Sequence, residues 1–393
     1  MLNTPFSPWP SFTEKEANAV RDVLLSNKVN YWTGNESRLF EQEFAAWLRC
    51  EYAIALTNGT VALDLALYAS GIGAGDEVVV ASRTFLASVS CIVNAGAIPV
   101  FADVDPDTQN ITAETISAVL SSKTRAIICV HLAGCPCDMD PIMALAEERG
   151  IAVIEDCAQA HGATYKGRAV GTIGHIGAWS FCQDKIMTTG GEGGMVTTND
   201  RSLWSKMWAY KDHGKSFDAV YNRQHPPGFR WVHDSFGTNW RITELQSVIG
   251  RVQLGYMPAW HDARKRNAEN IMAAAKACHA LRVPSVPANL EHAWYKAYVF
   301  VKPELLNEGW SRDRILEEMN ARGVPCYAGS CSEVYLEKAF DDTGWRPPVR
   351  LPIAKELGET SLMFLVHPTL TDAEISKTCV VLKEVMQLAS IPE

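Results

Sequence analysis

Short runs of valine, isoleucine and alanine alternate with segments of helical length between about residues 52 and 160. This alternation is typical of βαβ units, in which a helix connects one strand to the next. We expect two of the helices to begin at Thr112 and Asp138, whose side chains can cap a first turn. The predicted strands are residues 77–82, 98–105, 126–134 and 152–158. Because these runs are almost continuously apolar, the sequence predicts an α/β fold with a mostly parallel sheet that is covered on both faces.

The pattern changes in the second half of the chain. Two further β-like runs, AWSFC and GGMVTT, precede a helix that we expect to begin near Asp200. Residues 215–238 combine aromatic and basic side chains with a Pro-Pro-Gly break, which predicts a long irregular loop of the kind that often has a function. The remainder mixes short strands with amphipathic helices. We therefore predict a large domain over residues 1–255 and a smaller α+β domain over residues 256–393.

Composition restricts the partners of this chain. Of its 393 residues, 47% are hydrophobic and 21% are charged, which is typical of a folded globular protein. Lysine and arginine total 36 against 45 aspartates and glutamates, so the formal net charge is −9. Since this charge repels phosphate backbones, we expect no nucleic-acid partner.

The sequence also argues against a membrane and against an oxidising compartment. The longest uncharged run, Thr84–Ala102, contains Ser88, Asn94 and Pro99 and is better explained as helix, turn and strand than as a membrane span. The first residues lack a basic segment followed by an apolar one, so we expect a cytoplasmic protein. Eleven cysteines without a CxxC pair predict reduced thiols, with neither a zinc site nor a disulfide framework.

Three short motifs carry residues that could do chemistry. Residues 58–60, Asn-Gly-Thr, open a helix whose bare amides and hydroxyl could cradle a phosphate, although a simple helix cap explains them as well. Asp156, beside Glu155, ends a strand and could pair with a protonated ring nitrogen or cap a helix. Lys185 lies between Ser180 and a glycine-rich turn and could attack an aldehyde, or could be an ordinary surface lysine. Together, on an α/β frame, these are the parts that a pyridoxal phosphate site requires.

Two other motifs indicate no site. His131, Cys135 and Cys137 are close in sequence, but their short spacing lacks a second pair of ligands, so we expect no metal. The string GIGAGD at residues 71–76 precedes a strand instead of following one, which argues against a dinucleotide-binding fingerprint.

Longer blocks of the sequence point to one family. They include NGTVALDLAL, GIGAGDEVVVAS, PVFADVDPDT, VHLAGCPCDMDPI, VIEDCAQAHGA, GTNWRITELQSVIG and FLVHPTLT. On these blocks, nearly the whole chain resembles the DegT/DnrJ/EryC1/StrS family of nucleotide-sugar aminotransferases. The resemblance implies fold type I, the aspartate aminotransferase-like architecture, with pyridoxal 5'-phosphate as cofactor.

The resemblance assigns the chemical roles to three residues. Lys185 lies where the family binds pyridoxal phosphate covalently and where the same lysine then moves the proton between carbon atoms. Asp156 matches the partner of the pyridinium nitrogen, and Gln159 matches a residue near the ring hydroxyl.

Five further positions match residues that hold the cofactor. Gly59, Thr60 and Ser180 match the phosphate-binding positions, and Phe85 matches the aromatic side chain that stacks on the ring. Asn239 matches an asparagine that reaches the phosphate from the neighbouring subunit. The resemblance therefore implies a homodimer with shared active sites.

The chain departs from the family pattern at two places. The loop after Lys185 has one glycine more than the usual spacing, so we expect it to be reshaped. Residues 324–335, VPCYAGSCSEVY, replace a stretch in which many relatives carry histidine and proline. Because both regions border the sugar in the family, the substrate could differ from that of the best-known members.

The resemblance implies transfer of an amino group from glutamate to a nucleotide-linked keto-deoxysugar. A 4-keto-6-deoxy sugar is the acceptor expected from its frequency in the family, for surface polysaccharide or glycoside biosynthesis, while a 3-keto nucleotide sugar, a cyclitol or another cyclic ketone remains an alternative. We expect Arg223, Arg230 and Arg241, in or beside the aromatic loop, to bind the nucleotide. Some relatives are dehydratases with histidine in place of the lysine, and Lys185 argues against that activity.

Overall fold

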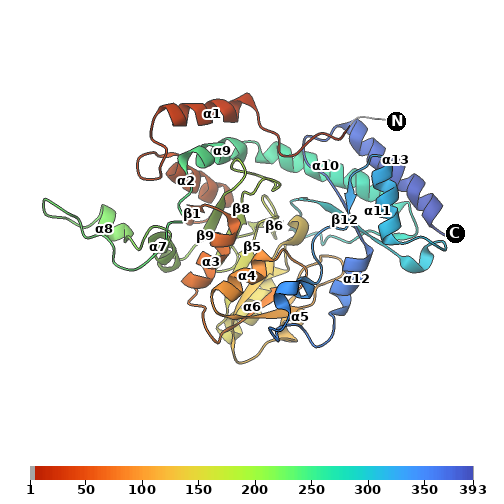
Figure 1. The fold of residues 1–393 in the computed structure, drawn as a ribbon, viewed down its shortest axis with the longest axis horizontal. Coiled ribbons are helices and arrows are strands. Elements are labelled where there is room, and N and C mark those ends of the chain that lie inside the picture. The colour runs from red at the N-terminus through yellow and green to blue at the C-terminus, as the bar shows by residue number, and fades with distance from the viewer. Residues whose placement is uncertain (1–4, 393) are drawn as a thin grey trace.

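A seven-stranded sheet forms the centre of the larger part of the molecule (Figure 1). The structure is a computed structural model that describes residues 5–392. Along the sheet the strands are ordered β1(Tyr52–Leu56), β9(Gly194–Thr198), β8(Ile176–Ser180), β5(Ala152–Asp156), β4(Thr124–Val130), β2(Glu77–Ala81) and β3(Ile98–Ala102). Within this sheet β9 is antiparallel to both neighbours, and the other strands share one direction. The predicted α/β class with a mostly parallel sheet is therefore confirmed.

All four predicted strands end earlier than the apolar runs suggested, the strand predicted over residues 77–82 at Ala81 and the one predicted over residues 152–158 at Asp156. The other two differ more. The strand predicted over residues 98–105 stops at Ala102, because the carboxylate of Asp103 turns away to accept hydrogen bonds from the amides of Ile353 and Ala354 at 3.0 and 2.9 Å. The strand predicted over residues 126–134 stops at Val130 and continues into a 3-10 turn. Both ends lie at the carboxyl edge of the sheet, where ligands bind in open α/β folds.

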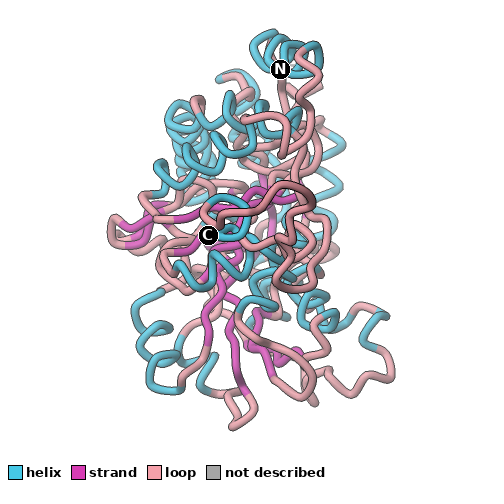
Figure 2. The backbone as a smooth tube through the Cα atoms, turned by 90° about the vertical axis from the view of Figure 1, so that its left-hand side faces the viewer, coloured by secondary structure: helices cyan, strands magenta, loops and turns pink. Residues whose placement is uncertain are grey.

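Helices lie on both sides of these strands (Figure 2). Those of the larger part are α1(Glu14–Leu25), α2(Glu36–Leu48), α3(Gly59–Ala69), α4(Ala87–Asn94), α5(Ala113–Ser117), α6(Met139–Arg149), α7(Arg201–Tyr210), α8(Phe217–Tyr221) and α9(Glu244–Leu254). Apolar side chains of the central strands are almost completely buried beneath them. The uncharged run that contains α4 and β3 is thus helix, turn and strand, as predicted.

The expected helix caps have different outcomes. The hydroxyl of Thr112 caps α5, and the carboxylate of Asp200 caps α7 by accepting hydrogen bonds from two amides. Asp138 occupies the capping position of α6, but its side chain caps nothing, so that part of the prediction is wrong. The physical reason is the hydroxyl of Tyr165, which donates to the Asp138 carboxylate at 2.5 Å and holds it away from the helix amides.

A four-stranded antiparallel sheet organises the C-terminal part of the chain. Its order is β10(Leu281–Arg282), β12(Ala297–Val301), β14(Ser361–Phe364) and β13(Cys326–Tyr327), and its helices are α10(Met257–Lys276), α11(Arg312–Ala321), α12(Pro352–Thr360) and α13(Asp372–Ala389). A small third sheet joins β11(Leu290–Glu291), β6(Thr164–Tyr165) and β7(Arg168–Ala169). Phe6, near the N-terminus, packs on the hydrophobic core of this C-terminal part, so the two parts share segments of the chain. The domain boundary predicted at residue 255 therefore stays a prediction.

The segment 215–238 projects from the body of the molecule near α7 (Figure 1). It is not irregular throughout, because the hydroxyl of Ser216 accepts a hydrogen bond from the amide of Ala219 and starts the short helix α8. Its aromatic side chains Phe229, Trp231 and Phe236 are exposed. Among residues 5–392, no helix combines the length and the apolar character needed to cross a membrane.

Candidate active site

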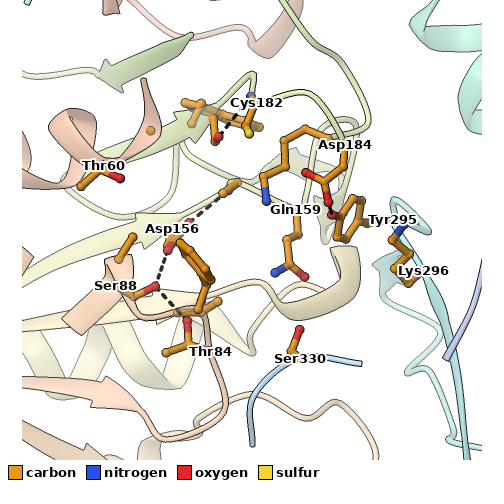
Figure 3. Close-up of a pocket in the computed structure, with 18 of the residues that line it drawn as sticks. Thr60, Thr84, Ser88, Asp156, Gln159, Cys182, Asp184, Tyr295, Lys296 and Ser330 are labelled. Atoms are coloured by element: carbon orange, nitrogen blue, oxygen red, sulfur yellow. Dashed lines mark hydrogen bonds between the residues drawn. The ribbon is translucent and has the colours of Figure 1, made fainter. Parts of the chain in front are cut away.

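A pocket of about 870 Å³ opens where the carboxyl edge of the large sheet faces the C-terminal part (Figure 3). The ends of strands β4, β5 and β8 and the start of α3 form one wall. The opposite wall comes from β12, β13 and the residues around β14. The expected residues Gly59, Thr60, Phe85, Asp156, Gln159, Ser180 and Lys185 all line this pocket.

Asp156 is fixed at the floor of the pocket. It is the last residue of β5 and is only 6% exposed. The hydroxyl of Ser88 donates to one carboxylate oxygen at 2.7 Å, and the amide of Ala158 donates to the other at 3.1 Å. The Ser88 hydroxyl lies 2.8 Å from that of Thr84, so a short chain of hydrogen bonds sets the position of the carboxylate (Figure 3).

Two hydrogen bonds hold the backbone of Lys185 in place. Its amide donates to the carbonyl of Cys182 at 3.1 Å, and its carbonyl accepts a hydrogen bond from the indole of Trp9 at 2.8 Å. The ammonium group lies 5.3 Å from the centre of the Tyr295 ring, which positions it over an aromatic face. The backbone of Lys185 is therefore anchored while its side chain lines the pocket.

Tyr295 joins the two walls through Asp184. Its hydroxyl donates to the Asp184 carboxylate, although the two residues are 111 positions apart in the sequence. Burial raises the pKa of Asp184, but the Lys185 ammonium and the Tyr295 hydroxyl lower it more, so the net pKa lies below its usual range. Asp184 therefore remains a carboxylate beside Lys185.

The start of α3 forms a cradle for an anion. The side chain of Asn58 caps the helix by accepting a hydrogen bond from the amide of Val61 at 3.0 Å. A Cβ atom on Gly59 would lie 2.6 Å from the Cβ of Ser180, so only glycine allows the helix to begin this close to β8. The amides of the first turn and the hydroxyls of Thr60 and Ser180 face the same space, as a phosphate site requires.

The comparisons with known proteins agree with this geometry. Residues 10–383 match the DegT/DnrJ/EryC1/StrS aminotransferase family. The chain belongs to this family. It is a pyridoxal phosphate-dependent aminotransferase of fold type I, as the sequence predicted.

Three similar proteins illustrate the match. The crystallised aminotransferase from Psychrobacter cryohalolentis is 65% identical, with a TM-score of 0.96 and coverage of 98% of this chain and 99% of that one. GDP-perosamine synthase from Escherichia coli O157:H7 is 36% identical over 91% of this chain and 95% of its own length. UDP-N-acetyl-3-dehydro-alpha-D-glucosamine 3-aminotransferase from Acidithiobacillus ferrooxidans is 34% identical over 93% and 95%.

The pocket of this aminotransferase fits pyridoxal phosphate in three respects. Asp156 is a buried carboxylate that already has its own hydrogen-bond donors, and such a group would suit a protonated ring nitrogen. The close approach of Gly59 to Ser180 leaves the cradle open to a phosphate. Gln159 accepts a hydrogen bond from the amide of Ala133 at 2.7 Å, which fixes its side chain in the same pocket that the exposed Phe85 lines.

The other expected residues lie outside this pocket. Asn239 forms an isolated β-bridge with Asp212, and the Arg241 guanidinium donates to the Asp212 carboxylate. Arg223 pairs with Asp234 at 2.9 Å on the surface of the projecting loop, where Arg230 is also exposed. Their roles in binding the phosphate or the nucleotide therefore stay predictions.

The extra glycine after Lys185 gives the following loop its shape. Gly190 and Gly191 have φ angles of +87° and +126°, which favour glycine over any other residue. Two side chains close the turn by donating to the backbone carbonyl of Glu192: the hydroxyl of Thr189 at 2.6 Å and the side-chain amide of Gln246 at 2.8 Å. Glu192 lines the pocket. The reshaping of this loop relative to the family stays a prediction.

Several pocket residues had no signal in the sequence. Ser88, Tyr295 and Lys296 belong to segments with no recognisable motif, and they reach the site only through the fold, while Asp184 lies beside Lys185 but was not singled out. By contrast, residues 324–335 were expected near the substrate, and Tyr327, Ser330 and Cys331 do line the pocket.

A buried group behind the pocket could be mistaken for a metal site. Ligand atoms of His131, Glu155 and Cys157 lie within 4.8 Å of one another. However, the Glu155 carboxylate already lies 2.9 Å from His131 Nε2 and accepts hydrogen bonds from the amides of Gly171, Ile173 and Gly174 at 2.9, 2.8 and 2.6 Å. Glu155 therefore holds the turn before β8 in place, which is a structural role.

Proposed function

We propose that this aminotransferase moves an amino group from L-glutamate to the keto group of a nucleotide-linked deoxysugar, for surface polysaccharide or glycoside biosynthesis. The first candidate acceptor is a 4-keto-6-deoxy sugar. The observation that carries the proposal is the size of the pocket, about 870 Å³, which extends beyond Asp156 and Lys185 to a second wall. That wall contributes Tyr327 and Ser330, which suit the hydroxyl groups of a sugar, and Met363 and Leu365, which suit a deoxy carbon. The names of the relatives support the same class of acceptor.

Bound pyridoxal phosphate supplies a cationic ring that withdraws electrons from the carbon that carries the amino group. The carboxylate of Asp156 would keep the ring nitrogen protonated, and Gly59, Thr60 and Ser180 would hold the phosphate. The amine of Lys185 would take the proton from one carbon and return it to another. Asp184 and Tyr295 would orient that amine, since both lie beside it.

A 3-keto nucleotide sugar is the second candidate acceptor. The Acidithiobacillus ferrooxidans relative bears the name of a 3-aminotransferase and is nearly as similar as GDP-perosamine synthase, at 34% against 36% identity. The two candidates differ in which carbon of the sugar must reach Lys185. Residues 324–335 would set that choice, because Tyr327, Ser330 and Cys331 border the space where the sugar would lie.

The proposed active form is a homodimer in the cytoplasm. The exposed aromatic side chains of Phe229, Trp231 and Phe236 support an interface on the projecting loop, since apolar surface of this kind is usually covered. Asn239, at the base of the loop, would then serve the partner's site. All eleven cysteines are free thiols, which suits a reducing compartment.

The decisive experiment is a panel of UDP-, GDP- and dTDP-linked 3-keto and 4-keto sugars, each incubated with the enzyme and L-glutamate. Mass spectrometry should detect an amino sugar, and the proposal expects the fastest turnover with a 4-keto-6-deoxy compound. Faster amination of 3-keto sugars would select the second candidate. Amination of free cyclic ketones without amination of any nucleotide sugar would contradict both. Sedimentation of the same enzyme should give the mass of a dimer.

A further inference from the structure

A second ammonium group lies in the wall opposite Asp156. Lys296, directly before β12, is half-buried and lines the pocket. Its Nζ lies 4.8 Å from the centre of the Tyr295 ring, and the Nζ of Lys185 lies 5.3 Å from the centre of the same ring. Figure 3 shows Lys296 beside Tyr295. Lys185 and Lys296 are the two cations among the described residues that line the pocket. Both ammonium groups therefore lie near the same aromatic ring in the pocket.

The surroundings of Lys296 carry more positive than negative charge. Arg264 of α10 is buried nearby, and its Nε and Nη2 have no hydrogen-bond partner among residues 5–392. Asp184 is the acid that faces this region, and its carboxylate already accepts the Tyr295 hydroxyl. Since charges removed from water without a partner are costly, the ammonium of Lys296, which lines the pocket, would be stabilised by an anionic ligand there.

The nearby histidines do not change this balance. Burial and the charges of Lys185 and Arg264 lower the pKa of His161 to about 3. Burial and the charges of Arg264 and Lys296 likewise lower the pKa of His367 to about 3. Both imidazoles are therefore neutral near pH 7, and the cations remain Lys185, Lys296 and Arg264.

We infer that Lys296 binds a carboxylate of the amino donor and is a specificity-determining residue for that half of the reaction. The position of Lys296 favours the donor over the nucleotide sugar. In an amino acid the carboxylates lie within a few bonds of the nitrogen that must reach Lys185. In a nucleotide sugar the diphosphate is separated from the keto carbon by the sugar ring. This inference rests on the proposed function, which makes L-glutamate the donor.

The charge of Lys296 should depend on pH in the working range. Burial, followed by the charge of Arg264, lowers the pKa of Lys296 to about 8. The Asp184 carboxylate raises this pKa, and the charge of Lys185 lowers it. The ammonium is therefore present below pH 8 and is lost as the pH rises through 8. Arg264, whose pKa is lowered by burial to about 9, loses its charge only at higher pH.

The test is the reaction of the cofactor-loaded enzyme with L-glutamate alone. The absorbance of the bound cofactor monitors this reaction in single turnovers. We expect Lys296→Ala and Lys296→Gln to weaken the apparent affinity for L-glutamate about 10-fold or more, and Lys296→Arg to restore most of it. Lys265→Ala removes the same charge from an exposed position on α10 and should change nothing. In the wild type the affinity should fall above pH 8, and in Lys296→Arg this loss should shift upward.

Two results would overturn the inference in distinguishable ways. Unchanged affinity for L-glutamate in both neutral variants would remove Lys296 from donor binding, and weaker inhibition of those variants by UDP or GDP would assign the ammonium to the diphosphate instead. Failure of the wild type to react with L-glutamate would contradict the proposed donor itself. The cofactor absorbance before mixing shows whether each variant has folded and loaded.

Discussion

The floor of the pocket and the projecting loop at residues 215–238 differ in how their polar and apolar groups are partnered. At the floor, Asp156 is 6% exposed and receives hydrogen bonds from within its own chain. On the loop, Trp231 is 80% and Phe236 is 96% exposed, and the pair Arg223 with Asp234 lies in solvent. One chain is thus sufficient to build the floor, whereas on the loop large apolar side chains stay uncovered in a single chain.

The largest expected effect of a single substitution at the floor is that of Lys185→Ala. Because the proposed mechanism assigns to this lysine both the binding of the cofactor and the movement of the proton, we expect loss of its cofactor absorbance and a fall in transamination of about 1,000-fold or more. A stopped assay with L-glutamate measures the activity, and circular dichroism should show an unchanged fold. Substantial activity in this variant would contradict the assignment of Lys185.

Asp156→Asn should have the next largest effect. Asparagine keeps the shape of the side chain and can still accept a hydrogen bond from Ser88, but it has no charge to hold a ring nitrogen protonated. We expect kcat/KM to fall about 100-fold, on the order of 3 kcal/mol in transition-state free energy. Ser88→Ala is the matched control, since it removes one hydrogen bond and keeps the charge, and it should reduce kcat/KM by less than about 10-fold. Equal losses in the two variants would mean that position and not charge is what Asp156 provides.

A contrast between groups positioned locally and groups positioned by distant contacts explains how much of the site could be predicted from the sequence. Asp156 and Lys185 could be found because each follows a strand, and strand ends meet at one edge of a parallel sheet. Tyr295, Lys296 and Trp9 could not, because their roles depend on contacts across 111 or more residues, and their own segments carry no pattern that forecasts those contacts. The fold was predictable where apolar periodicity determines it, and less so where one side chain redirects another, as Tyr165 does with Asp138.

Gly59→Ala should have an intermediate effect, which is limited to the affinity for the cofactor. The added Cβ would lie 2.6 Å from the Cβ of Ser180, so α3 must move away from β8 and the phosphate cradle must open. We expect the affinity for pyridoxal phosphate to fall about 10-fold, measured by titrating the apoenzyme and following absorbance. In Gly73→Ala the new Cβ would meet one atom at 4.0 Å, so this control should bind the cofactor normally. Normal binding by Gly59→Ala would show that the helix start does not contact the phosphate.

The smallest expected effect is that of Arg230→Ala on the loop. An exposed arginine that binds a nucleotide phosphate through solvent-accessible contacts should contribute modestly, so we expect the KM for the nucleotide sugar to rise about 3- to 10-fold while the KM for L-glutamate is unchanged. Arg241 is a less specific target, because it is largely buried against Asp212, and Arg241→Ala should lower the melting temperature as well. Equal changes in both KM values for Arg230→Ala would remove the loop from nucleotide binding. A selective rise would instead mean that the nucleotide is among the partners the loop lacks in a single chain.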